Sequence, residues 1–147
     1  MPDGFASDLL RIVDTAEPEL RALSRVDVSE LRGSGAWSRL EILGHLIDSA
    51  ANNHQRYVRV QSVDELCFPD YDQQAWVASQ DYRTCEWDRL VDLWAAYNRH
   101  LAHVLEAMPA ANLETPCRVG ESQAGSVRDL IDQYLVHMRH HLAQLTE

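Results

Sequence analysis

The sequence predicts an all-α domain folded as an antiparallel four-helix bundle, and three observations predict it. Apolar residues recur every three or four positions through four long stretches, as on the buried face of a helix. The alternating pattern of β-strands is almost absent. A length of 147 residues, with 46% hydrophobic and 24% charged residues, suits one domain with a substantial core. We therefore expect a single domain over residues 1–147.

The first helix is expected to start at Phe5. Its apolar positions follow helical spacing, namely Leu9, Ile12, Val13, Ala16, Leu20 and Leu23. Pro18 falls inside this pattern, and because proline lacks an amide hydrogen it should kink the helix or restart it. A linker containing Gly33 and Gly35 is predicted to follow.

The second helix is predicted to begin at a capping box of Ser38 and Glu41 and to run to about Gln61. Its apolar stripe comprises Leu43, Leu46, Ile47, Ala50, Ala51 and Val58. Residues 62–84 then form a long irregular loop with one short helix expected at about 73–79. Loops of this length on a helical bundle often border a functional site.

The third helix should start near Cys85 or Glu86 and end at Pro109. Its buried positions are predicted to be Leu90, Trp94, Tyr97, Leu101, Val104, Leu105 and Met108. After a loop over residues 110–125, Ser126 and Asp129 open the last helix in the manner of a capping box. The apolar face of that helix comprises Val127, Leu130, Ile131, Tyr134, Met138 and Leu145.

The composition excludes several partners. A formal net charge of -10 repels the phosphates of nucleic acids and anionic lipid surfaces. No apolar run approaches the roughly 20 residues of a membrane span, and residues 1–4 lack the features of a signal peptide. These properties predict a cytoplasmic protein. The three cysteines, Cys67, Cys85 and Cys117, show no metal-knuckle spacing and are expected to be reduced thiols, with their roles left open.

Three of the seven histidines lie within the last predicted helix. His137 and His141 are four residues apart, so their imidazoles project about 40° from one another and can converge on one ion. His140 points further round the helix and is expected to be a bystander. Two ligands make half a metal site, and an ordinary pair of hydrogen-bonded helix histidines fits the same spacing.

His45 lies on the second helix, away from its apolar stripe. It shares a polar face with Asp48, Asn52 and Arg56, beginning at Glu41. This face is either solvated or a polar strip that lines a cleft between helices, with Gly44 allowing another element to approach closely. The remaining histidines, His54, His100 and His103, do not converge with the pair and are expected to lie at the surface or to be satisfied by hydrogen-bond partners.

Several motifs together resemble the DinB-like, or YfiT-like, family of four-helix proteins. The motif of the second predicted helix consists of Trp37-Ser38, the run from Glu41 to Leu46, and Asp48. The motif of the long loop consists of Phe68-Pro69, Tyr71-Asp72 and Trp76. The motif of the last helix consists of Val127-Arg128-Asp129-Leu130, His137, His140-His141-Leu142 and Gln144. Their order and spacing extend over about residues 8–144. The resemblance implies that His45, His137 and His141 bind a divalent metal ion, zinc or nickel, at one end of the bundle.

The resemblance further implies an enzyme that activates water or a low-molecular-weight thiol, as a hydrolase or a thiol S-transferase acting on a small molecule. The alternative is a non-catalytic helical interaction module with a vestigial or structural metal site. Either protein is expected to be a homodimer. Asp48 and Gln144 are each either an ordinary solvated residue or a residue that orients a ligand imidazole or the bound water. Tyr134 either donates a hydrogen bond to a metal-bound group or packs in the core.

Two further side chains carry alternative interpretations. Arg56 is either a receptor for an anionic substrate group or an ordinary surface arginine. Trp76 either walls a cleft or anchors its own loop.

Overall fold

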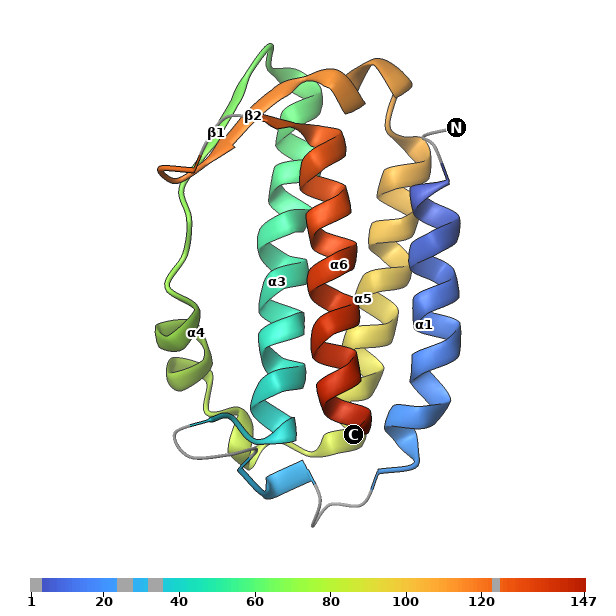
Figure 1. Cartoon of the computed structure of the whole chain (residues 1–147), viewed down its shortest axis with the longest axis vertical. Coiled ribbons are helices and arrows are strands. Elements are labelled where there is room, and N and C mark those ends of the chain that lie inside the picture. Colours follow the sequence, from blue (N-terminus) through green and yellow to red (C-terminus); the bar gives the residue numbers. More distant parts are fainter. Residues whose placement is uncertain (1–3, 24–27, 32–35, 123–124) are drawn as a thin grey trace.

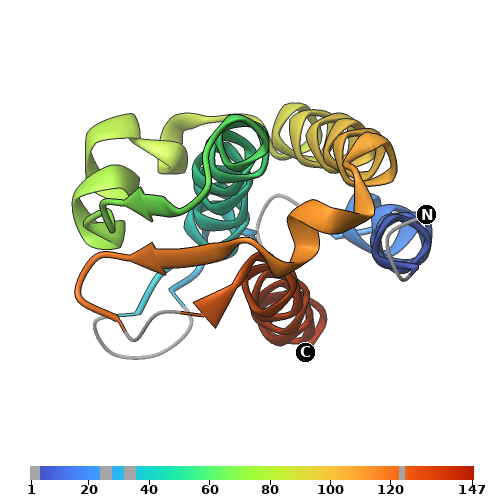
Figure 2. The same ribbon diagram turned by 90° about the horizontal axis from the view of Figure 1, so that it is seen from above.

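The computed structural model describes residues 4–23, 28–31, 36–122 and 125–147, and in it four long helices form a bundle (Figure 1). These helices are α1 (Phe5–Arg21), α3 (Arg39–Arg59), α5 (Trp87–Ala107) and α6 (Val127–Thr146). Helix α1 packs against α5 and α6, and α3 packs against the same two helices, so α1 and α3 lie at opposite corners (Figure 2). The predicted all-α four-helix bundle is confirmed. None of the described helices has the length and apolar content that a membrane crossing requires.

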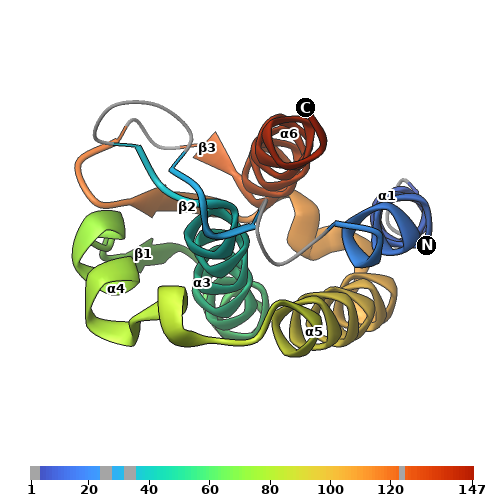
Figure 3. The same cartoon turned by 90° about the horizontal axis from the view of Figure 1, so that it is seen from below.

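Not all neighbouring helices of the bundle are antiparallel. Helices α3 and α6 are antiparallel, as are α1 and α5, but α3 and α5 run in the same direction, and so do α1 and α6 (Figure 1). The cause is the long segment after α3, which returns the chain to the end of the bundle where α3 began. That segment also covers the outer side of α3 (Figure 3).

Short elements make up the connections between the long helices. They are η1 (Val60–Ser62), β1 (Leu66–Phe68), α4 (Gln73–Gln80), η2 (Tyr82–Thr84), η3 (Ala110–Glu114), β2 (Pro116–Val119) and β3 (Gly125–Ser126). Strand β1 pairs in parallel with β2, and β2 pairs in antiparallel with β3. This sheet was not predicted, because strands of two to four residues are too short to show alternation. The sheet fastens the long loop after α3 to the loop before α6.

The predicted capping boxes are both present. The Ser38 hydroxyl accepts a hydrogen bond from the amide of Glu41, and the Glu41 carboxylate accepts one from the amide of Ser38. Ser126 and Asp129 make the same reciprocal pair at the start of α6. Pro18 lies within α1, which continues without restarting for three more residues. The predicted linker with Gly33 and Gly35 falls outside the described residues.

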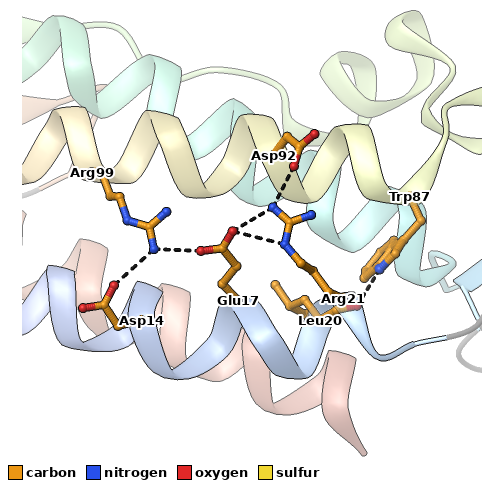
Figure 4. A network of polar contacts seen from close by, with 7 residues as sticks. All are labelled: Asp14, Glu17, Leu20, Arg21, Trp87, Asp92 and Arg99. Atoms are coloured by element: carbon orange, nitrogen blue, oxygen red, sulfur yellow. Dashed lines mark hydrogen bonds and ion pairs between the residues drawn. The ribbon is translucent and has the colours of Figure 1, made fainter.

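Polar contacts join α1 to α5 along their exposed edge (Figure 4). Arg21 contacts Glu17 and Asp92, and Arg99 contacts Glu17 and Asp14. Exposed ion pairs of this kind contribute little to stability because water screens them. Beneath them the Trp87 indole donates a hydrogen bond of 2.6 Å to the carbonyl of Leu20, which joins the end of α1 to the start of α5.

The ends of α3 and α6 are also joined directly. The buried Arg39 guanidinium donates hydrogen bonds of 2.8 Å to the carbonyls of Leu145 and Glu147. The start of α3 is therefore held against the end of α6. The apolar stripe predicted for α3 is largely buried, but it was wrong for Val58, which is 50% exposed.

Candidate metal centre

Three imidazoles converge between α3 and α6, at the end of the bundle where α3 begins. One ligand atom from each of His45, His137 and His141 lies within 4.8 Å of the other two, and this is the one such group among the described residues. The Nε2 atoms of His45 and His137 are 3.0 Å apart. The rings meet edge to face, at centroid distances of 4.6 to 4.9 Å. The four-residue spacing on α6 and the antiparallel packing of α3 produce this arrangement.

The geometry fits a divalent ion. Nitrogen atoms bound to one tetrahedral zinc at about 2.0–2.1 Å lie roughly 3.4 Å apart, close to the observed separation of the His45 and His137 nitrogens. Two imidazole lone pairs facing each other repel unless one nitrogen carries a proton or both bind a cation. The donor set, three imidazoles, is one that zinc and nickel both accept.

Gln144 fixes the orientation of one ring. The Nδ1 atom of His141 lies 2.7 Å from Oε1 of Gln144, so Nδ1 carries the proton and the lone pair of His141 is on Nε2. A ligand histidine needs this tautomer to present Nε2 to a metal ion. Gln144 therefore occupies the place of an orienting residue, which the sequence had suggested.

Burial keeps the imidazoles neutral. Removal from water, followed by the proximity of His137 and His141, lowers the pKa of His45 to about 3. The same cause, with His141 and His140 as neighbours, lowers the pKa of His137 to about 4, and burial also lowers the pKa of His141. At neutral pH all three rings are uncharged, which is the form that binds metals.

Asp48 bonds to residues of the long loop. Its Oδ1 accepts hydrogen bonds from the Tyr82 hydroxyl at 2.6 Å and from the Gln80 amide at 2.8 Å. Burial raises the pKa of Asp48, against the effect of these two bonds. Neither Oδ2 of Asp48 nor Nδ1 of His45 has a hydrogen-bond partner in the described part of the chain, so Asp48 does not orient the His45 ring in this structure.

The polar face of α3 is buried rather than solvated. His45 is 1% exposed, Asp48 2%, Asn52 7% and Arg56 6%. The solvated interpretation of this face is therefore wrong, as is the surface-arginine interpretation of Arg56, and of these four residues Arg56 lines a cleft. Gly44 provides the predicted close approach, because the Tyr82 ring occupies the space that a Cβ atom would need.

The other candidates lie outside the group of three rings. Tyr134 is buried, and its hydroxyl donates to Oδ1 of Asn98, so it takes the core position that was its alternative. His140 is exposed and touches the group only through a ring contact with His141, at a centroid distance of 5.0 Å. Trp76 is 37% exposed and packs against Tyr71 of its own loop.

The remaining histidines and the cysteines match their predictions. His100 and His103 are exposed, and half-buried His54 has its Nδ1 atom 2.9 Å from the Tyr97 hydroxyl. The three cysteines are free thiols, with Cys117 buried.

A cleft leads away from His137 between α3, α6 and the long loop. Its first part, of about 210 Å³, is lined by His137, Tyr134, Tyr71 and Arg56 among others. Sequence reasoning missed Tyr71 as a wall of this cleft, although the residue lies in a motif that carried the family resemblance. The structure thus provides space for a small molecule beside the imidazoles.

Comparison with known proteins identifies the family. The profile of the DinB superfamily matches residues 11–145, which is most of the chain. The chain belongs to the DinB superfamily. The motifs around His45 and His137 had indicated this relationship, and it is now shown over nearly the whole bundle.

Two known proteins are similar to this chain. A protein of Oceanobacillus iheyensis named "Putative metal-dependent hydrolase OB0782" is 26% identical over 113 residues, which are 77% of this chain and 65% of that protein. The chain thus matches slightly less than two thirds of that relative's length. The solved structure of YfiT from Bacillus subtilis, described as a probable metal-dependent hydrolase with an unusual four-helix bundle topology, superposes with a TM-score of 0.88 at 16% identity. The match covers 98% of this chain and 83% of YfiT, and it shows that the two share a fold.

Proposed function

We propose that this protein is a divalent-metal-dependent enzyme that activates water or a low-molecular-weight thiol for attack on a small molecule. The observation that carries the proposal is the convergence of three neutral imidazoles, from His45, His137 and His141, of which His137 lines a cleft. The naming of the Oceanobacillus relative as a metal-dependent hydrolase supports the same class of chemistry. Zinc and nickel are the ions that we propose for this donor set.

The three imidazoles would hold the ion and leave coordination positions open toward the cleft. When bound, such an ion lowers the pKa of the water or thiol that it contacts and so supplies a nucleophile near neutral pH. Gln144 holds His141 in the metal-binding tautomer. Tyr71 and Tyr134 line the adjacent cleft, where they would limit the volume available to water and position the substrate.

Metal binding is tested with protein purified without a histidine tag and treated with a chelator. Zinc and nickel affinities are measured by competition with a chromophoric chelator for wild type, His137→Ala and His140→Ala. We expect one ion per chain for wild type and for His140→Ala. For His137→Ala we expect a loss of at least about tenfold, the lower end of what even an outer-shell change costs. A wild-type protein that binds neither metal would overturn the proposal.

Activity separates the two chemistries. With metal supplied, conjugation of a thiol to 1-chloro-2,4-dinitrobenzene reports thiol transfer, and release of nitrophenol from a nitrophenyl ester reports hydrolysis. We expect a rate above the uncatalysed one for one of the two reactions, abolished in His137→Ala and retained in His140→Ala. Equal rates in wild type and His137→Ala for both reactions would contradict a metal-dependent enzyme.

A further inference from the structure

Arg56 is a buried cation without a partner for its binding edge. The residue is 6% exposed, and its Nε and Nη2 atoms make no hydrogen bond to any described residue. These two nitrogens form the edge of a guanidinium that donates two parallel hydrogen bonds to a carboxylate or phosphate. Burial of a charged group without hydrogen bonds is costly. An anion that accepts hydrogen bonds from Nε and Nη2 would remove this cost.

The rest of the guanidinium is held in place. Its Nη1 atom donates to Oδ1 of Asn53 at 3.4 Å, and its Cζ atom lies 5.4 Å from the centre of the Phe68 ring, within the range of a cation–π contact. Asn53 comes from α3 itself and Phe68 from strand β1. An arginine fixed on two sides is preorganised for a ligand on the third.

The cleft connects this edge to the imidazoles. Arg56 lines the part of the cleft that contains His137 and also an adjoining cavity of about 290 Å³ under β2 and β3, and the two share Asp70, Leu130 and Gln133 as well. Arg56 follows His45 by eleven residues, which is about 16 Å along the axis of α3. An acid group at Arg56 and a reacting group at the imidazoles must therefore be separated by several bonds.

We propose that Arg56 is the oxyanion subsite of this cleft, where it binds the carboxylate or phosphate of an elongated substrate whose other end reaches the three histidines. The link to those histidines rests on the proposed function, whereas oxyanion binding by Arg56 does not. Asp70 is the competing partner. Its carboxylate lies in the same cleft and its charge acts on Arg56, but it makes no ion pair with Arg56 and accepts a hydrogen bond from the amide of Tyr71.

The test uses metal-free protein, so that it does not depend on the metal site. The Arg56 side-chain Nε–H resonance, assigned by its absence in Arg56→Met, is followed while hexanoate, inorganic phosphate or hexanol is added. We expect hexanoate, phosphate or both to shift this resonance in a saturable manner, and hexanol to leave it in place. A shift with hexanoate alone indicates a carboxylate subsite, and a shift with phosphate alone indicates a phosphate subsite.

Three variants make the result decisive. Anion affinity, measured on backbone amides of the cleft, should fall at least about tenfold in Arg56→Met, as expected for loss of a hydrogen-bonded charge. The anion affinity should rise in Asp70→Asn, because this substitution removes a negative charge that repels the anion. Arg56→Lys keeps the charge without the forked edge and should bind more weakly than wild type, and it replaces Arg56→Met if that variant does not fold.

Equal affinity in wild type and in the Arg56 variants would overturn the proposal, as would the lack of any response to both anions. A loss of stability in Asp70→Asn as large as that in Arg56→Met would also overturn it, because Asp70 would then be the partner of Arg56. Anion binding without metal binding would leave the subsite standing and refute the metal-dependent enzyme. Metal binding without anion binding would overturn the Arg56 subsite and leave the metal-dependent enzyme standing.

Discussion

The ring of Tyr82 lies against the Cα atom of Gly44, in space that any larger residue would fill with its Cβ. The Tyr82 hydroxyl then reaches Oδ1 of Asp48, one turn further along α3. Glycine in a helix interior costs about 1 kcal/mol relative to alanine. At position 44 the packing of the Tyr82 ring against the helix offsets that cost. This contact lies at the residue next to His45.

Gly44→Ala is therefore expected to destabilise the protein, although alanine is the better helix former. The overlap with Tyr82 should displace that ring from Asp48 and cost about 1–3 kcal/mol, as overpacking of a core usually does. The free energy of unfolding from urea denaturation measures the effect. Metal affinity should fall as well, because His45 is the next residue.

The matched control is the same substitution in a Tyr82→Ala background. With the ring removed, Gly44→Ala should be neutral or stabilising by up to about 1 kcal/mol, which is the intrinsic preference of a helix for alanine. A double-mutant cycle gives the coupling between the two sites. If Gly44→Ala costs the same with and without the Tyr82 ring, the contact is not the reason for the glycine.

Gln144→Leu is expected to weaken metal binding without unfolding the protein. The substitution removes the acceptor for Nδ1–H of His141, and loss of such an outer partner typically lowers metal affinity about 10–100-fold. Asp48→Asn is the comparison, because Asp48 bonds to Tyr82 and Gln80 and not to an imidazole. Competition with a chromophoric chelator should show a larger loss for Gln144→Leu. The reverse order would mean that Asp48 supports the site more than Gln144 does.

The sequence predicted the long helices and their caps because these depend on local patterns. Ser38 with Glu41 and Ser126 with Asp129 form their boxes within four residues of chain. The pairing of Cys67 with Arg118 in the small sheet joins segments about fifty residues apart, and no local pattern records it. The return of the chain along α3, which makes α5 parallel to α3, depends on that same long segment.

The candidate site was predicted partly by geometry and partly by resemblance. Helical spacing alone brought His137 and His141 together, whereas the inclusion of His45 came from the family motifs. A helical wheel assigns His45 and Arg56 to a polar face, and it cannot show that the long loop covers this face. The burial of Arg56 under β1 and the contact of Tyr82 with Gly44 are tertiary facts, so they became visible only in the folded chain.

Tyr134→Phe is expected to reduce stability and to leave metal affinity near that of wild type. The hydroxyl donates to Oδ1 of Asn98 in the core, and its removal leaves that buried acceptor without its donor, at a cost of about 1–3 kcal/mol. Asn98 also donates to the carbonyl of Trp94, so its side chain stays anchored. Urea denaturation and chelator competition measure the two effects separately. A large loss of metal affinity with unchanged stability would place the Tyr134 hydroxyl in the metal site instead.

The stability of the metal-free protein should depend on pH through the buried imidazoles. The pKa of His45 is lowered to about 3 and that of His137 to about 4, whereas in the unfolded chain both should titrate near the ordinary value of about 6.5. Between these limits the unfolded chain binds protons that the folded chain does not. The free energy of unfolding therefore falls as the pH drops from about 6.5 toward 4, by at most about 1.4 kcal/mol per pH unit for each histidine.

Toward pH 8 these two histidines should contribute almost no pH dependence, because they are then neutral in the unfolded chain as well as in the folded one. Urea denaturation of chelator-treated protein between pH 4.5 and 8 measures the profile. A His45→Gln, His137→Gln double variant is the control, since glutamine is polar but does not titrate, and its profile should be flatter over the acidic range. Parallel profiles for the double variant and wild type would show that the two imidazoles titrate in the folded chain as they do in the unfolded one, and so that burial does not lower their pKa.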